Sequence, residues 1–294
     1  MVMIGKKDVL GVVYTPVEIV DFMVRSVDDV LVREFGVGLD GDVEIIDPFT
    51  GLGVFVIRLL EYLSFGSLVS KYVSGGIRAF EVDPDSYRMA KENIEGKYRA
   101  LTGRYEEFRG IELLDTFASE LGGSDRVRVI ISNPPYFAWQ RSENDGTKSL
   151  KYDVLDSRIR ETYSIRSSAK NKNSLYDAYV RAFRWASDNI GDRGVICFIS
   201  NGSYIDSSAA EGIRKCFMDE FSSVYCLNLR GNFRKGDKGE GGNVFGNQCG
   251  TTVAISLLVK GGKSVSDGIH YKDIGDGLST EQKIEQLVRW SSMV

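Results

Sequence analysis

The sequence predicts an α/β fold with an open sheet, and three observations support this prediction. Short apolar runs that are typical of buried strands alternate with amphipathic helical patterns along most of the chain. One run, at residues 43–46, leads through a glycine turn at 47–53 into a helical pattern at 55–63. Another run, at residues 127–132, ends in a rigid polar turn at 133–136. Open α/β sheets present their chemistry at such strand ends.

Composition excludes several classes of protein. The chain has 294 residues, 43% of them hydrophobic, which is enough for one large or two small domains with a substantial core. A net charge of −4 excludes a generally basic nucleic-acid coat, and the absence of long apolar runs or a signal-peptide pattern predicts no membrane association. The four cysteines show no C-x-x-C pairing, so we expect reduced thiols and a cytoplasmic protein. With His270 as the only histidine, the sequence predicts neither a metal cluster nor a histidine-based triad.

The turn Asn133-Pro134-Pro135-Tyr136 has the residue types that would hold a planar amine. Pro135 keeps Pro134 extended, so the Pro134 carbonyl is a fixed acceptor with no competing N–H at either proline. Asn133 adds a side-chain carbonyl. Two acceptors that point at one NH₂ group would draw its hydrogens out of the ring plane. The nitrogen lone pair would then be free to attack an electrophile. Tyr136 offers a flat face on which the ring can stack.

The amino-terminal half supplies the cofactor side. Thr15 before Pro16 predicts a helix with Thr15 as its cap and Pro16 as its first residue, continuing to about residue 30. The turn that precedes this helix can touch a cofactor. At 47–53 a third glycine of the dinucleotide fingerprint is missing, and Asp47 heads the turn instead. An acidic residue there suits a cationic ligand such as a methionine ammonium group rather than a pyrophosphate.

Two further strands are predicted to end in acidic residues. Residues 76–82 reach Glu81, which is placed to accept hydrogen bonds from both hydroxyls of a ribose. Residues 109–114 are followed by Asp115, which is placed to accept from an adenine amino group. Three acidic strand ends followed by one Asn-Pro-Pro-Tyr turn, in that order, form a more specific functional signature than any one of these motifs alone.

Two motifs of other enzyme classes are rejected. Pro84-Asp85 with Glu95 and Lys97 matches the letters of a nuclease pattern, but these residues fall in a predicted helix, and that nuclease needs a strand hairpin. The glycine-rich loop at 231–250 lacks the Lys-Ser pair of a phosphate-binding loop, so we predict that the chain by itself is not an ATP-driven translocase.

The remaining segments complete the α/β pattern. Residues 137–172 are polar without a sustained period and are predicted to be a functional or disordered loop. Ser174 and Asp177 resemble a capping box that would begin the next helix. Further strands are predicted at 194–200, 223–229 and 251–260, and further helices at 174–190, 209–221 and 281–290.

Two basic segments flank the proposed site. Residues 141–172 contain eight Lys and Arg against five Asp and Glu, and residues 230–243 contain four against two. Charge alone would fit two solvated loops. Their position beside the site makes them candidates for contacts with DNA phosphates.

These motifs together resemble the methyltransferase part of the single-chain type ISP restriction–modification enzymes, over residues 10–275. The resemblance lies in five stretches of the sequence: Tyr14-Thr15-Pro16, DPFTGLG at 47–53, EVDP at 81–84, the turn at 133–136 and segments between residues 171 and 260. It implies a Rossmann-like, S-adenosylmethionine-dependent methyltransferase fold, with a mostly parallel seven-stranded sheet, an antiparallel last strand and helices on both faces. It also implies methylation of a flipped adenine in double-stranded DNA, held by residues 133–136. The residues implied to bind S-adenosyl-L-methionine are Tyr14, Thr15, Pro16, Asp47, Pro48, Gly51, Gly53, Glu81, Asp83 and Asp115.

The sequence departs from this family in two ways. Phe49 and Leu52 stand where smaller residues are common, which would reshape the methionine pocket. The family also carries nuclease and helicase-like domains before this part and a target-recognition domain after it. We expect residues 1–40 to be a helical cofactor-side segment, 41–275 the catalytic domain and 276–294 a helix leading towards the absent target-recognition domain. The chain is then a stand-alone relic or one piece of a split system with separate subunits.

Two alternative functions share the same residues. An RNA or protein-glutamine amino-methyltransferase would use the Asn-Pro-Pro-Tyr turn in the same way, because an amide nitrogen presents the same geometry. A degenerate, non-catalytic DNA-binding module is the alternative from a different class. Methylation assays on DNA, RNA and protein would distinguish an RNA or protein-glutamine methyltransferase from a DNA methyltransferase. Absence of cofactor binding would favour the non-catalytic DNA-binding module.

Overall fold

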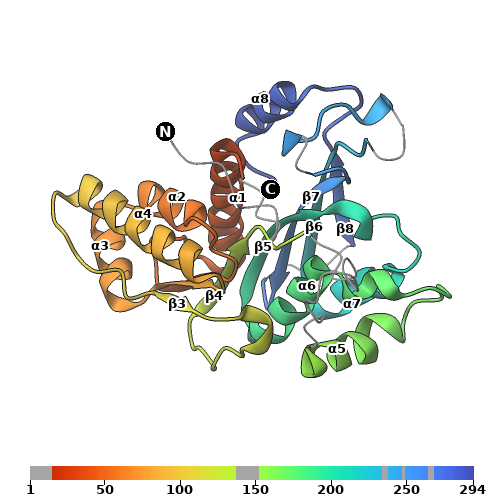
Figure 1. Cartoon of the computed structure of the whole chain (residues 1–294), viewed down its shortest axis with the longest axis horizontal. Helices are drawn as coiled ribbons and strands as arrows, with labels where there is room; N and C mark the ends of the chain where they lie inside the picture. The colour runs from red at the N-terminus through yellow and green to blue at the C-terminus, as the bar shows by residue number, and fades with distance from the viewer. Residues whose placement is uncertain (1–14, 137–151, 234–237, 247–248, 264–267) are drawn as a thin grey trace.

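A computed structural model gives the structure of the protein and describes residues 15–136, 152–233, 238–246, 249–263 and 268–294. The described strands form one eight-stranded sheet with helices on both faces (Figure 1). The strands are β1 Val43–Asp47, β2 Ile77–Glu81, β3 Ile111–Leu113, β4 Val127–Ser132, β5 Gly194–Asn201, β6 Ser223–Arg230, β7 Val253–Lys260 and β8 Ile269–Asp273. The α-helices are α1 Val17–Phe35, α2 Val54–Tyr62, α3 Phe65–Ser74, α4 Pro84–Thr102, α5 Asp153–Ile159, α6 Ala178–Asn189, α7 Glu211–Glu220 and α8 Thr280–Trp290.

The strand order is β3-β2-β1-β4-β5-β7-β6-β8. Strands β1 to β5 pair in parallel, β7 runs antiparallel to both β5 and β6, and β8 is parallel to β6. The chain builds β2 and β3 on one side of β1 and then crosses to place β4 on the other side. The carboxyl ends of β1 and β4 therefore meet at a topological switch point, where open α/β folds bind ligands.

The core has two layers, one on each face of the sheet. Helices α1 to α4 cover one face and α5 to α7 the other, while α8 lies against α1 (Figure 1). Alternation along β4 divides its side chains between the layers, because Val129 and Ile131 join the first and Ile130 joins the second. Strands β1 and β4 are buried along their whole length, as expected for central parallel strands covered on both faces.

Most predicted elements are confirmed. The predicted helix behind the nuclease-like letters is α4, in which Asp83 is the N-cap and accepts a hydrogen bond from the Ser86 N–H at 2.8 Å. Glu95 and Lys97 therefore lie on a helix rather than on a strand hairpin. At α1 the cap differs from prediction by one residue, since Pro16 is the N-cap and the Thr15 hydroxyl accepts from another part of the chain.

Three predictions about elements were wrong. Within the described ranges the sheet has eight strands rather than seven, because the exposed segment Ile269–Asp273 pairs with β6 and extends the edge. Residues 153–164 of the predicted polar loop form α5 and a π-helical turn, while residues 137–151 lie outside the described part. The capping box expected at Ser174 is absent, because Asn173–Tyr176 is a 3₁₀ turn and α6 begins at Ala178.

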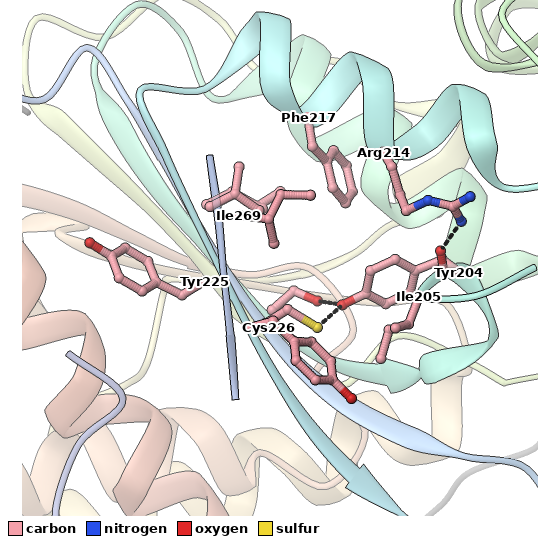
Figure 2. A pocket seen from close by; sticks show the side chains of 11 residues that line it. Tyr204, Ile205, Arg214, Phe217, Tyr225, Cys226 and Ile269 are labelled. Carbon is pink, nitrogen blue, oxygen red and sulfur yellow. Dashed lines mark hydrogen bonds between the residues drawn. The ribbon is translucent and has the colours of Figure 1, made fainter. Parts of the chain in front are cut away.

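A cavity of about 120 Å³ lies between α7 and the β6, β7 and β8 end of the sheet (Figure 2). The Tyr204 hydroxyl lies 2.5 Å from Ser256 Oγ and 3.3 Å from Cys226 Sγ, and the Arg214 guanidinium donates to the Tyr204 carbonyl at 2.7 Å. These contacts use the polar groups and leave an apolar interior. The cavity belongs to the opposite end of the sheet from β1 and β2.

Candidate active site

The predicted site residues gather at one edge of the sheet. Asp47 ends β1, Glu81 ends β2 and Asn133 follows β4, and these three strands are neighbours in parallel register. Asp115 follows β3 by two residues at the same edge. The topology therefore brings together residues from four separate parts of the sequence.

Asp47 is fully buried with a hydrogen-bonding group left over. Its Oδ1 accepts from the Ser132 hydroxyl at 2.5 Å and from the Phe49 N–H at 3.3 Å. Its Oδ2 has no hydrogen-bond partner in the described part of the chain. Burial raises the pKa of Asp47 to about 7, although the bond from Ser132 opposes the rise. A buried carboxylate oxygen without a donor is costly, so this atom is suited to a cationic or N–H ligand.

The conformation of the turn after Asp47 depends on two glycines and on hydrogen bonds to Glu81. Gly51 and Gly53 have φ values of +57° and +88°, which side chains rarely adopt, and a Cβ on Gly51 would meet nothing within 4 Å. The Gly51 N–H donates to Glu81 Oε2 at 2.8 Å, and the Asp83 N–H donates to Glu81 Oε1 at 2.8 Å. A carboxylate has about four acceptor sites, so Glu81 keeps capacity for ligand hydroxyls. Burial raises the pKa of Glu81 despite these bonds.

Asp115 and Pro48 accept hydrogen bonds from residues that follow β3 in the sequence. Asp115 Oδ1 accepts from the Phe117 N–H at 3.0 Å, and Oδ2 accepts from the Tyr152 hydroxyl at 2.9 Å. The Pro48 carbonyl accepts from the Thr116 hydroxyl at 2.5 Å. Tyr152 was missed by sequence reasoning, because it lies in a segment taken to be a loop.

The Asn133-Pro134-Pro135-Tyr136 turn contacts the chain before α1. The Asn133 Nδ2 donates to Thr15 Oγ1 at 3.0 Å, which orients the amide. The Tyr136 hydroxyl is buried with no hydrogen-bond partner among the described residues, and burial raises the pKa of this phenol well above its usual value. The Tyr136 ring lies edge-on to Phe245, with the ring centres 5.5 Å apart at 74°.

Two of the predicted cofactor-binding residues give no support for that role. Tyr14 lies outside the described residues. Asp83 uses its Oδ2 to cap α4. Ser132 and Phe245 contact site residues and were not predicted; the only sequence signal for Ser132 is its place at the end of a buried strand.

The basic segments have fewer available cations than their composition suggests. Arg158 forms an ion pair with Asp188, Arg166 with Asp219 and Arg230 with Asp273. Residues 141–151 and 234–237 lie outside the described part. Contacts with phosphates by these segments stay a prediction.

No group of three or more His, Cys, Asp or Glu side chains within the described ranges could hold a metal ion. In the same ranges, every helix is too short or too polar to cross a membrane.

Comparison with known proteins gives matches over most of the chain. Residues 4–231 match the family model described as N-6 DNA Methylase. The structure is similar to the ATP-dependent Type ISP restriction–modification enzyme LlaBIII bound to DNA, with 39% identity and a TM-score of 0.89. It is also similar to a nuclease-deletion mutant of the Type ISP enzyme LlaGI with a DNA substrate mimic, with 39% identity and a TM-score of 0.88. A third similar structure is the DrdV–DNA complex, with 39% identity and a TM-score of 0.87.

The three matches cover nearly all of this chain but a small part of the others. They include 97%, 96% and 95% of this chain and 21%, 26% and 29% of LlaBIII, LlaGI and DrdV. The chain therefore spans less than a third of the length of each. No curated protein matches the sequence.

Proposed function

The chain belongs to the N-6 DNA methylase family, and we propose that it transfers a methyl group from S-adenosyl-L-methionine to the N6 amine of adenine in double-stranded DNA, as part of a restriction–modification system. The observation that carries this proposal is the Asn133 to Tyr136 turn at the end of β4, next to Asp47 with its unpartnered buried oxygen. An amine-holding turn and a cation-seeking carboxylate at one switch point fit a two-substrate site.

The donor side fits S-adenosyl-L-methionine by the chemistry of its groups. Asp47 Oδ2 would accept from the methionine ammonium, the open backbone at Gly51 would leave room for the ligand, and Glu81 would accept from the ribose hydroxyls. Asp115 would accept from the adenine amino group after giving up its bond from Tyr152. The Thr15 hydroxyl accepts the bond from Asn133 at the same edge, and Pro16 follows it in the chain. When bound, the donor supplies an electrophilic methyl group on a positively charged sulfur.

The acceptor side holds the amine for direct displacement. The Asn133 side-chain carbonyl and the Pro134 carbonyl would accept the two N–H groups, so the nitrogen lone pair points at the methyl carbon. A nitrogen–carbon bond forms as the carbon–sulfur bond breaks, the bonding pair stays on sulfur, and the amine then loses a proton to solvent. The rate gain comes from orientation and from acceptors matched to the charge that develops on nitrogen. Tyr136 would stack on an adenine that has left the duplex.

Donor binding is expected to depend on the ionisation of Asp47. Because its pKa is about 7 in the folded protein, Asp47 is mostly protonated at pH 6 and mostly ionised at pH 8. A bound ammonium group favours the ionised form, so affinity should rise roughly tenfold from pH 6 to pH 8, with about one proton released on binding at pH 6. Calorimetry in buffers of different ionisation enthalpy measures both quantities. Equal affinity at the two pH values without proton release would contradict this role, and Asp47→Asn should abolish the dependence.

The same shift affects stability in the opposite sense. The folded protein keeps the Asp47 proton up to about pH 7, whereas the unfolded chain releases it near pH 4. The stabilising contribution of this carboxyl is thus fully present below about pH 4 and is lost as the pH rises through about 7.

We propose further that the chain acts together with other functional parts. Target recognition, translocation and cleavage would be supplied by target-recognition, helicase-like and nuclease domains or subunits. Contacts with phosphates by the two basic segments would carry no sequence information, so the chain alone should bind DNA weakly and methylate slowly with little sequence preference. We propose that residues 1–40 contribute to cofactor binding, that residues 41–275 form the catalytic domain and that residues 276–294 lead towards a target-recognition domain. The four cysteines are buried free thiols, which supports a proposed cytoplasmic location.

Weak binding through phosphates has a measurable salt signature. With about three phosphate contacts, the binding constant for DNA should fall roughly 40-fold between 50 and 200 mM salt. Fluorescence anisotropy with a labelled duplex measures this slope. Tight binding that resists salt, with a single methylated motif, would show instead that specificity resides within this chain.

A further inference from the structure

The glycine-rich loop, here residues 238–246 between β6 and β7, docks on the start of α8 through its backbone. The Gly242 N–H donates to the Leu278 carbonyl at 2.9 Å, and the Gly277 N–H donates to the Gly239 carbonyl at 2.6 Å. A Cβ on Gly241 would lie 2.2 Å from the Leu278 carbonyl oxygen, and one on Gly242 would lie 2.7 Å from the Thr280 nitrogen. The glycines are therefore explained by close approach of two backbones.

Lys283 of α8 fixes this docking. Its side chain is fully buried, and its ammonium group donates to the carbonyls of Leu229 at 2.9 Å, Glu240 at 2.9 Å and Gly242 at 2.6 Å. All three ammonium protons are used, as a buried charge requires. The Thr280 hydroxyl adds a bond to the Asn243 carbonyl at 2.8 Å.

The fixed loop carries an aromatic ring to the proposed base site. The buried Asn243 donates to the carbonyls of Gly231 at 3.0 Å and Thr251 at 2.9 Å, and its Oδ1 accepts from the Phe245 N–H at 2.9 Å. This amide sets the backbone at Phe245, whose side chain is 6% exposed and lies edge-on to Tyr136. The Tyr136 hydroxyl has no hydrogen bond in the described part of the chain, so ring packing has to hold its orientation.

We propose that Lys283 is a positioning residue for the Asn133 to Tyr136 turn. It holds the glycine-rich loop, the loop holds Phe245, and Phe245 holds the Tyr136 ring at the proposed base site. Helix α8, far along the sequence from the turn, thereby controls capture of the base. The effect on methyl transfer rests on the proposed function, whereas the effect on the order of the turn does not.

The test compares Lys283→Met with the matched control Lys272→Met. Lys272 is an exposed lysine whose ammonium lies 3.5 Å from the centre of the Trp290 ring, so it contacts the last residue of α8 instead of the first turn, where Thr280 and Lys283 bond the loop. Thr280→Val is the milder variant, because it removes only the hydroxyl bond to Asn243. Hydrogen–deuterium exchange of peptides covering 131–136, 239–246 and α4 is measured, with donor affinity and the single-turnover rate on DNA.

Lys283→Met should raise exchange at 239–246 and at 131–136 by about fivefold or more, leave α4 unchanged and keep donor affinity within about twofold. Misplacement of the Tyr136 ring should lower the single-turnover rate roughly tenfold or more. Thr280→Val should show the same pattern more weakly and decides the case if Lys283→Met does not fold, while Lys272→Met should match the parent. Increased exchange confined to 239–246 would overturn the proposal. A parent protein without methyl transfer would contradict the proposed function only, because the exchange measurement still tests the positioning.

Discussion

Replacing Asn133 by alanine is expected to lower the single-turnover rate of methyl transfer roughly 100- to 1,000-fold, because one preorganised acceptor for the charge developing on the amine is lost. Donor affinity should stay nearly constant, since the proposed donor contacts are made by Asp47 and Glu81. Quenched-flow transfer of a labelled methyl group, paired with calorimetry of donor binding, separates the two effects.

Two variants make this experiment specific. Thr15→Val removes only the acceptor of the Asn133 Nδ2 bond and should cost roughly tenfold, as expected for lost orientation without lost chemistry. Asn189→Ala is the matched control, because Asn189 ends α6 and its side chain bonds Leu121 and Trp185, away from the carboxyl ends of the strands. Full single-turnover activity of Asn133→Ala would show that amine polarisation by this side chain is wrong.

Replacing Asp47 by asparagine is expected to weaken donor binding about 30-fold or more, because a charge-assisted hydrogen bond contributes about 2 kcal/mol or more. The folded protein should nevertheless be at least as stable at pH 8. Burial raises the pKa of Asp47 from 3.8 to about 7, so keeping it ionised costs about 4 kcal/mol. The amide that replaces it leaves a buried NH₂ group with its two N–H donors unsatisfied, at about 1–3 kcal/mol for the group.

Thermal unfolding and calorimetry at pH 8 measure these opposite effects. Asp125→Asn is the matched control, because Asp125 is exposed at the amino end of β4, on the opposite edge of the sheet. The control should change neither quantity. A lower melting temperature with unchanged donor affinity would assign Asp47 a structural role only.

Much of the site could be predicted from sequence because strand ends carry their position with them. Asp47, Glu81 and Asn133 each follow a buried apolar run, and parallel strands place such residues at one edge. The helix α4 was predictable for the same local reasons, a proline at its first residue and Asp83 as its cap.

The missed features depend on contacts between distant residues. Strand β8 has exposed side chains on both faces and is defined by pairing with β6, which its own sequence does not encode. Tyr152 and Phe245 reach the site through tertiary contacts with Asp115 and Tyr136. Lys283 reads as a solvated lysine on an amphipathic helix until the loop that covers it is placed.

The most direct test is to identify the methylated atom. The purified chain, in excess over substrate at low salt, is given a methyl-labelled donor with duplex DNA, RNA or protein, and the digested products are analysed by mass spectrometry. The proposed function predicts N6-methyladenine from duplex DNA, and none when Asn133→Ala is used for the same time. Label on cytosine, RNA or protein glutamine instead, or no transfer to any substrate while the donor binds, would contradict it.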